Sequence, residues 1–161
     1  MFKGELIGIY ISERKCEELK PVDSVRAVEG KGLEGDRYFL QQGTFSKPGI
    51  PALEVTLIEI EAIEALAAEK KLAISPGQAR RNLITREVPL NHLVAKDFLI
   101  GEVVLHGIAL CEPCAHLQKL TDEAILDGLR HRGGLRAQVL KGGILRTGDA
   151  IQVVNAVGAE E

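Results

Sequence analysis

Tryptophan is absent from this sequence of 161 residues, and the aromatic content is only 4%. A hydrophobic core therefore has to be filled mostly by valine, isoleucine, leucine and alanine, in a chain that is 45% hydrophobic. That content allows one continuous core, and the length suits a single domain spanning residues 1–161. Glycine, in contrast, occurs 17 times, which predicts many tight turns or bulges.

A basic charge balance, a long apolar run and an export signal are also missing. The net charge is -3 at pH 7, whereas general nucleic-acid binders are usually basic. No apolar run approaches the about 18 residues of a membrane span, and the first twelve residues lack the small-residue cleavage site of a signal peptide. We therefore expect a cytoplasmic protein with no nucleic-acid partner and no membrane partner.

Cysteine is scarce, with three in the chain, so the cysteines cannot all pair with one another. Without an export signal, free thiols in a reducing compartment are expected rather than a disulfide framework. Two of the three stand in the stretch LCEPCAHL, residues 110–117, whereas Cys16 has no partner nearby and is interpreted as incidental.

The hydrophobic pattern predicts many short strands and a few helices. Strands are expected at 5–11, at 23–30, at 82–85, twice within 92–111, and as a pair within 135–154. Helices are expected at 59–70 and at 116–134, with a stop at Gly133 and Gly134, and 75–81 is expected to be a loop. Because the helices do not alternate regularly with the strands, we expect a mainly β protein, a partly closed barrel with peripheral α-helices, rather than a doubly wound parallel sheet.

The helix expected at 59–70 has a clear apolar face. Ile60, Ile63 and Leu66 recur at helical spacing, and glutamates fill the opposite face. We expect these three side chains to pack the helix against the outside of the barrel.

The pair Cys111 and Cys114 is compatible with several chemistries. A structural zinc site needs four ligands, and the available set is Cys111, Cys114, His116 and His131, which does not form two compact pairs. A dithiol redox centre also stands between a strand and a helix, but that motif belongs early in a βαβ unit. A plain alternative is that both cysteines are buried core residues.

A single reactive thiol is the remaining possibility, and the proline between the cysteines favours it. Pro113 suits the start of a helix, which would put Cys114 in the first turn, where unpaired N–H groups and the helix dipole favour an anion. A thiolate in such a position attacks sulfur, carries a persulfide or binds a soft metal. Cys111 would then end the preceding strand, as a helper or as a buried bystander.

Two arginine clusters in an acidic chain predict a site for a small anion. They are Arg80, Arg81 and Arg86, and Arg130, Arg132 and Arg136. Arginine binds phosphate or carboxylate bidentately, and backbone N–H groups around paired glycines are able to form an anion-binding nest. We expect Arg80, Asn82 and the 132–136 loop to face one cleft that also contains Cys114; surface solvation and a simple helix cap are the alternatives.

The stretch GLEGDRY adds an acid and an arginine in adjacent positions. Asp36 is expected to accept hydrogen bonds from the loop backbone while Arg37 faces a ligand, and a plain turn is the alternative.

Several of these stretches occur in one order that is specific for a known family. They are GLEGDRY, VTLIEIEAIEAL, PGQARRNLITR, LNHLV, IGEVVL, LCEPCAHL, RGGLRAQVLKGG and a final GD. With them the chain resembles a stand-alone MOSC domain, named after the C-terminal domain of molybdenum cofactor sulfurases, over about residues 28–154. The resemblance implies a MOSC-type β-barrel with peripheral helices, and a cysteine that carries sulfur or ligates molybdenum.

On this chain the matching cysteine is Cys114, as catalytic thiolate and metal ligand. The R-x-N pattern of members that contact molybdopterin matches Arg80 and Asn82, and the expected cofactor-binding residues as a set are Arg37, Arg80, Arg81, Asn82, Arg132, Gly133, Gly134 and Arg136. Many relatives have a histidine where this chain has Tyr38, so any role of that histidine does not carry over.

The resemblance also implies which partners the chain would need. No pyridoxal-phosphate-binding domain and no iron–sulfur domain is expected in these residues, so the chain would take sulfur from a donor such as a cysteine desulfurase, or electrons from a donor protein. The expected function is a molybdenum-cofactor-binding or sulfur-carrier protein, either a sulfurtransferase or a redox component. The alternative, from another class, is a non-catalytic module that binds a small anion or a partner protein and has inert, buried cysteines.

Overall fold

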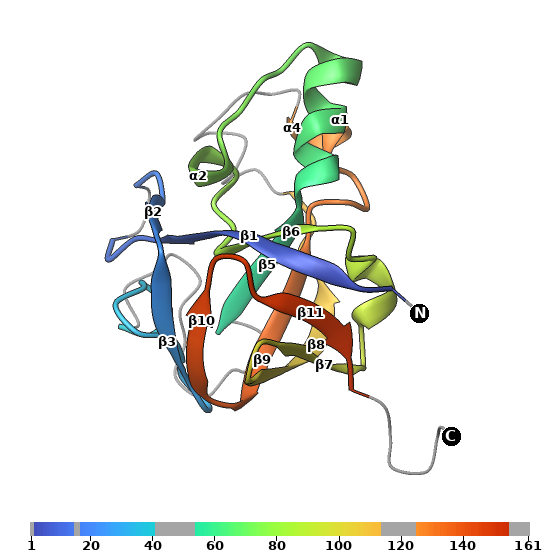
Figure 1. The fold of residues 1–161 in the computed structure, drawn as a ribbon. Helices are drawn as coiled ribbons and strands as arrows, with labels where there is room; N and C mark the ends of the chain where they lie inside the picture. The colour runs from blue at the N-terminus through green and yellow to red at the C-terminus, as the bar shows by residue number, and fades with distance from the viewer. Residues whose placement is uncertain (1, 15–16, 41–53, 114–124, 155–161) are drawn as a thin grey trace.

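A computed structural model describes residues 2–14, 17–40, 54–113 and 125–154 (Figure 1). Among these residues, seven strands close into a barrel in the order β11-β7-β8-β9-β5-β6-β1, because β11 also pairs with β1. The strands are β1 (Gly4–Ile11), β5 (Val55–Glu59), β6 (Leu83–Arg86), β7 (Asp97–Ile100), β8 (Val103–Leu110), β9 (Leu135–Lys141) and β11 (Ala150–Val153). The predicted mainly β barrel with peripheral helices is confirmed, and the barrel is closed rather than partly closed.

A second, smaller sheet lies beside the barrel. It consists of β10 (Gly143–Arg146), β3 (Ser24–Val28) and β4 (Gly32–Leu33), and Figure 1 shows β3 and β10 next to the barrel strands. Val25 and Ala27 of β3 belong to the same buried cluster as the barrel interior, so the two sheets share one core. The short strand β2 (Lys20–Val22) extends the barrel sheet at β1.

The barrel interior is filled by aliphatic side chains, as the composition predicts. Leu6 and Ile9 of β1 and Leu83 of β6 point inward, and Phe98 is the one aromatic residue among the described residues that are buried in this core. A 3₁₀ helix, η2 (Leu90–Leu93), contributes two further buried leucines. Close packing of these side chains excludes water from the barrel axis.

Helix α1 (Ile60–Lys70) lies outside the barrel and connects β5 to the parallel strand β6. Ile63 and Leu66 are buried in a second apolar cluster, and Ile60 packs against it half-buried, so the predicted packing face is confirmed. The cluster also contains residues of α4 (Ile125–Gly128), and Figure 1 shows α1 and α4 together at one end of the barrel. None of the helices in the described ranges is long and apolar enough to span a bilayer.

Exposed ion pairs also join α1 to α4 and to the turn that follows it. Lys70 pairs with Asp127, and Arg132 Nη2 donates to Glu69 Oε1 at 2.6 Å. The hydrogen bonds from Arg132 and Lys70 hold the pKa of the Glu69 and Asp127 carboxyls, respectively, below their usual values. Because these carboxylates are solvated, the pairs contribute little to stability.

Three local expectations were wrong. Residues expected as a loop contain helix α2 (Pro76–Ala79), because Ser75 and Gln78 form a capping box and Pro76 begins the helix. The C-terminal pair of strands is in fact three strands: β9, β10 and β11. The helix expected to end at Gly133 ends at Gly128, and His131 in the turn that follows has a left-handed backbone (φ 62°) that no helix continues through; residues 116–124 of that helix lie outside the described residues.

Glu54, the residue just before β5, is a buried acid. Glu54 is 7% exposed, and its Oε1 accepts a hydrogen bond from Val139 N at 2.8 Å. The register of β8 and β9 shifts beside this point, between Val104 and Leu105. Burial raises the pKa of Glu54, and the bond from Val139 only partly offsets this.

We expect Glu54→Gln to raise the free energy of unfolding at pH 7. A carboxyl whose pKa is higher in the folded state stabilises the fold fully only below its unfolded pKa, near 4.5, and that contribution is lost as the pH rises through the folded pKa. Glutamine keeps the acceptor for Val139 without the buried charge. Urea unfolding at pH 7 and pH 4 should show a gain that shrinks at pH 4, and the exposed variant Glu64→Gln should show no such change; a gain of equal size at both pH values would contradict this account.

Candidate functional site

The guanidinium of Arg81 joins three segments of the chain. Arg81 lies between α2 and β6 and is 7% exposed. Its Nε donates to Gly133 O at 2.8 Å, its Nη2 to Cys111 O at 3.1 Å, and its Nη1 to Ala79 O at 3.3 Å. The end of β8 and the turn before β9 are therefore fixed to the same side chain.

The turn before β9 packs tightly against the chain that follows β8. Cys111 N donates to Gly134 O at 2.7 Å. A Cβ on Gly133 would lie 2.5 Å from Cys111 O and 2.9 Å from Pro113 Cδ, so only glycine allows this approach. This contact explains the glycine at 133, and the expected anion-binding nest stays a prediction.

Glu112 and His131 form a second connection between these segments. Glu112 Oε1 accepts from His131 N at 2.7 Å, and Glu112 Oε2 lies 2.9 Å from His131 Nδ1. Asn91 Nδ2 also donates to His131 O at 2.7 Å. Residues 111–113 are thus held to residues 131–134 from both sides, by Arg81 and by Glu112.

Asn82 links three strands through its amide. Its Oδ1 accepts from Thr56 N at 3.1 Å and from Thr56 Oγ1 at 3.2 Å, and its Nδ2 donates to Tyr10 O at 3.0 Å. Asn82 is fully buried, so these contacts with β5 and β1 make it part of the framework of the barrel. Direct contact between Asn82 and a ligand stays a prediction.

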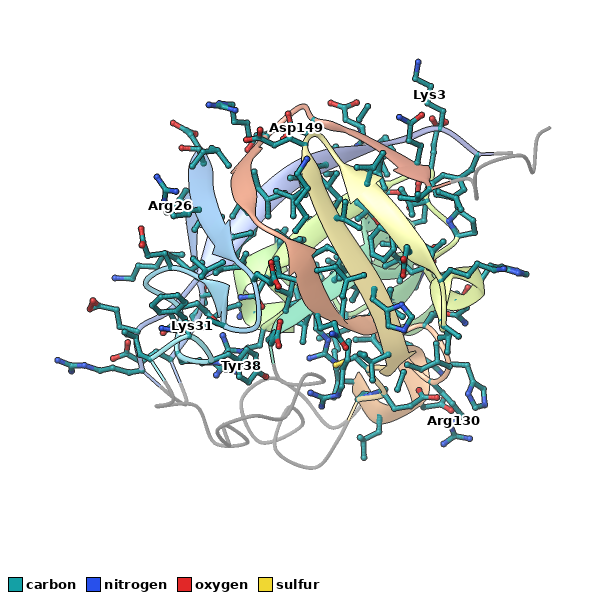
Figure 2. The ribbon with its side chains drawn as sticks, turned by 90° about the horizontal axis from the view of Figure 1, so that it is seen from below. Lys3, Arg26, Lys31, Tyr38, Arg130 and Asp149 are labelled. Atoms are coloured by element: carbon teal, nitrogen blue, oxygen red, sulfur yellow. The ribbon has the colours of Figure 1, made fainter. Side chains whose placement is uncertain are left out.

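Arg37 is buried beside its neighbour Asp36, to which it donates a hydrogen bond. Asp36 accepts from Ser12 N at 3.1 Å, from Arg37 Nη1 at 3.1 Å and from Tyr38 N at 3.3 Å, which is the loop-capping role that the sequence predicts. Arg37 is 3% exposed, its Nη2 donates to Arg80 O at 3.4 Å, and its guanidinium lies 4.4 Å from the centre of the Tyr38 ring. Figure 2 shows Tyr38 beside the smaller sheet.

Arg136 lies on the outer face of the barrel. Its neighbours Leu135 and Ala137 point into the core, and it stands directly opposite Thr56 in the β5–β9 register. Arg136, Thr56 and Asn82 therefore form one polar row across neighbouring strands. Arg136 Nη1 is buried and has no hydrogen-bond partner among the residues that the structure describes.

The predicted clusters are partly brought together. Arg81, Gly133 and Arg136 lie around the end of β8, and Asn82 adjoins Arg136 through Thr56, although these residues are far apart in sequence. Arg132 turns away and binds Gly128 O and Glu69. Arg130 points away from the body of the molecule, on the other side from Arg26 (Figure 2).

Of the three cysteines, Cys111 alone is among the residues that the structure describes. Cys111 is 2% exposed and immediately follows β8, as expected for a residue at a strand end. Cys114 and His116 lie outside the described residues, as does Cys16, so the predicted helix start after Pro113 stays a prediction. Within the described ranges no group of three histidine, cysteine or acidic side chains is arranged to hold a metal ion.

Sequence reasoning missed Thr56 and the Glu112–His131 connection. Threonine in an apolar strand carries no chemical signal, and its role follows only from its strand register beside Asn82. A glutamate between two cysteines is visible in the sequence, but its partner lies nineteen residues further on.

A hollow of about 230 Å³ lies beside the first strand, next to Ser12. Glu13, Glu17 and Glu18 line it, with Lys20 as its one basic residue among the described lining. Its acidic lining makes it unsuitable for an anion, so the arginine site around Arg136 is distinct in chemistry.

The sequence model of the MOSC domain family matches residues 48–152, which is more than half of the chain. The chain belongs to the MOSC domain family. Proteins of this family are associated with molybdenum cofactor sulfurase-type systems. Among curated proteins, none matches the sequence.

Solved structures of other MOSC-type proteins share the fold. The YuaD protein of Bacillus subtilis is 19% identical with a TM-score of 0.78, and the match covers 95% of this chain and 98% of that one. YiiM of Geobacillus stearothermophilus is 12% identical with a TM-score of 0.71, covering 94% and 75%. YiiM of Escherichia coli is 17% identical with a TM-score of 0.64, covering 97% and 71%. At these identities the likeness establishes the fold alone.

We expect Arg81→Lys to destabilise the MOSC barrel in spite of the retained charge. An ammonium group cannot donate in three fixed directions to the carbonyls that the planar guanidinium reaches. Hydrogen bonds to charged groups contribute about 1.5–3 kcal/mol each, so the free energy of unfolding should fall by about 2 kcal/mol or more in urea unfolding. The exposed Arg130→Lys is the matched control and should change it by less than about 0.5 kcal/mol; equal effects of the two variants would refute the assignment.

Proposed function

We propose that this MOSC protein binds the molybdenum cofactor or carries sulfur for it, with Cys114 as the working thiolate. The observation that carries the proposal is Arg136, whose buried Nη1 has no hydrogen-bond partner in the described part of the chain. A buried charged donor without an acceptor is costly, so its presence suits a site that an anionic ligand completes. The phosphate and polar pterin edge of molybdopterin are acceptors that arginine binds well.

The rest of the polar row supports this role for Arg136. Thr56 and Asn82 hold each other across β5 and β6, which fixes the sheet surface on which Arg136 lies. Arg81 and the pair of glycines at 133 and 134 fix the turn that leads into β9. In the proposal these residues form the frame, and Arg136 makes the direct contact.

The thiolate half of the proposal rests on residue order. Cys114 directly follows Pro113 in the sequence, the last described residue of the segment that Arg81 and Glu112 hold. Arg81 and Gly134 hold Cys111 in place by hydrogen bonds. A thiolate there is suited to ligate a soft metal or to hold a persulfide sulfur, and the bound cofactor would supply the redox or sulfur-accepting metal.

The other predicted cofactor-binding arginines have secondary roles in the proposal. Arg37 and Arg80 adjoin each other through one hydrogen bond and stay candidates for a second anionic group. Arg132 is engaged with Glu69 and would have to leave that partner to bind a ligand. In the proposal, the sulfur comes from a donor such as a cysteine desulfurase, or the electrons come from a donor protein.

The proposal is tested by purifying the protein from a host that makes the cofactor and measuring molybdenum and pterin. We expect both in the wild type and a loss of about tenfold in Arg136→Ala, because one charge-assisted contact of about 1.5 kcal/mol corresponds to that factor. Arg26→Ala is the control, since Arg26 is exposed on the smaller sheet (Figure 2). Arg136→Lys should retain an intermediate amount, because lysine keeps the charge but not the fork.

Cys114→Ser separates the proposal from a non-catalytic binding module. We expect Cys114→Ser to lose bound molybdenum, or sulfane sulfur after loading with a persulfide, with little loss of stability. If native Cys114 is modified by a thiol reagent only after unfolding, and Cys114→Ser retains molybdenum and sulfur at wild-type levels, the binding module with inert cysteines is the better account.

A further inference from the structure

Glu112 makes an unusual contact for an exposed glutamate. Both of its carboxylate oxygens are directed at one residue, with Oε1 accepting from the main-chain N–H of His131 at 2.7 Å and Oε2 lying 2.9 Å from its Nδ1. The side chains of Glu112 and His131 are 41% and 76% exposed. Solvated pairs of this kind contribute little to global stability, so the contact calls for another explanation.

The backbone of His131 points to the same conclusion. It is left-handed, with φ 62°, a conformation that glycine adopts readily and other residues adopt at a cost. Two glycines follow after Arg132, at 133 and 134, so glycine is present elsewhere in this turn. The ring of the histidine at this left-handed position lies against the Glu112 carboxylate.

The Glu112–His131 contact lies where the chain that leaves β8 approaches the turn before β9. Asn91 Nδ2 donates to the main-chain carbonyl of His131 at 2.7 Å. Both the N–H and the C=O of His131 are therefore hydrogen-bonded to side chains. Two residues further on, Gly133 and Gly134 touch the chain at Cys111, and β9 then carries Arg136. The Glu112 contact therefore fixes both the chain that leaves β8 and the chain that brings Arg136 to the polar row.

We propose that Glu112 is a positioning residue of the anion site around Arg136: through His131 it sets the turn at residues 131–134 against residues 111–113. The inference rests on the proposed function, because it assigns Glu112 to the site that holds the cofactor. Arg81 secures this junction from the buried side and Glu112 from the exposed side. The two act on the same pair of segments, so loss of Glu112 loosens the site without opening the core.

The chain supplies a matched control in His106 and Asp97. His106 Nδ1 lies 2.7 Å from Asp97 Oδ1, and both side chains are part-exposed, at 33% and 47%. His106 is on β8, the same strand that ends before Cys111, but its partner lies on β7. Asp97→Ala thus removes a similar exposed histidine–carboxylate contact that does not join the two segments.

Two variants of Glu112 separate position from charge. Glu112→Ala removes both contacts with His131. Glu112→Gln keeps an oxygen for the His131 N–H, and its amide N–H donates to Nδ1 when the imidazole proton is on Nε2. The variants are expressed in the host that makes the cofactor, with Arg136→Ala and Cys114→Ser beside them, and molybdenum, pterin, melting temperature and amide hydrogen exchange of residues 129–135 are measured.

We expect Glu112→Ala to lose molybdenum and pterin by about tenfold, as for groups that orient metal and cofactor ligands, and to speed exchange at residues 129–135. Glu112→Gln should keep both near wild-type levels, and Asp97→Ala should keep both while changing the melting temperature as much as Glu112→Ala does. Rescue by glutamine is the result that a general effect on stability would not give.

Other outcomes overturn the inference in distinguishable ways. If Glu112→Ala keeps wild-type molybdenum and pterin while Arg136→Ala and Cys114→Ser lose them, the positioning role fails and the proposed function stands. If Glu112→Gln loses as much as Glu112→Ala, charge rather than position is responsible, and the inference is wrong. If the wild type binds neither molybdenum nor pterin, the proposed function fails and this inference fails with it.

Discussion

The guanidinium of Arg81 meets three main-chain carbonyls at one buried point, and the arrangement of the site depends on that point. A carbonyl that is buried without a donor destabilises the fold, and the planar fork of arginine serves several acceptors at once. Here the acceptors belong to Ala79 at the end of α2, to Cys111 after β8, and to Gly133 before β9. The barrel ladders set the strands side by side, and Arg81 decides how the segments beyond their ends approach each other.

The arginines near the site have divided roles. Arg81 and Arg37 are buried and bind carbonyls or a neighbouring carboxylate, and Arg132 binds an exposed glutamate of α1. Arg136 lies on the polar row with a buried donor and no acceptor for it among the described residues. Most of these arginines therefore stabilise the framework, and in the proposed function an anion would complete the hydrogen bonds of Arg136.

Much of the architecture follows from the amino-acid pattern. The apolar face of α1 is correctly predicted from the spacing of Ile60, Ile63 and Leu66, because helical periodicity is a local property. The capping box at Ser75 and Gln78 was equally local and was missed, although its S-P-x-Q signature is present in the sequence. The third C-terminal strand was missed for another reason: β10 pairs with β3, more than a hundred residues away, and no local pattern announces such a partner.

The sequence by itself determined the aliphatic core, the mainly β class, the outer helix and the kinds of group present at the site: a thiol after a proline, paired glycines and several arginines. The tertiary structure alone decided which arginine is committed to which partner. Arg81 reaches acceptors 52 and 30 residues away, and those acceptors are main-chain carbonyls. Every residue carries such a carbonyl, so the sequence does not mark the ones that a side chain will bind. Only the closed barrel, by bringing the end of β8 and the start of β9 within reach of Arg81 at the start of β6, selects them.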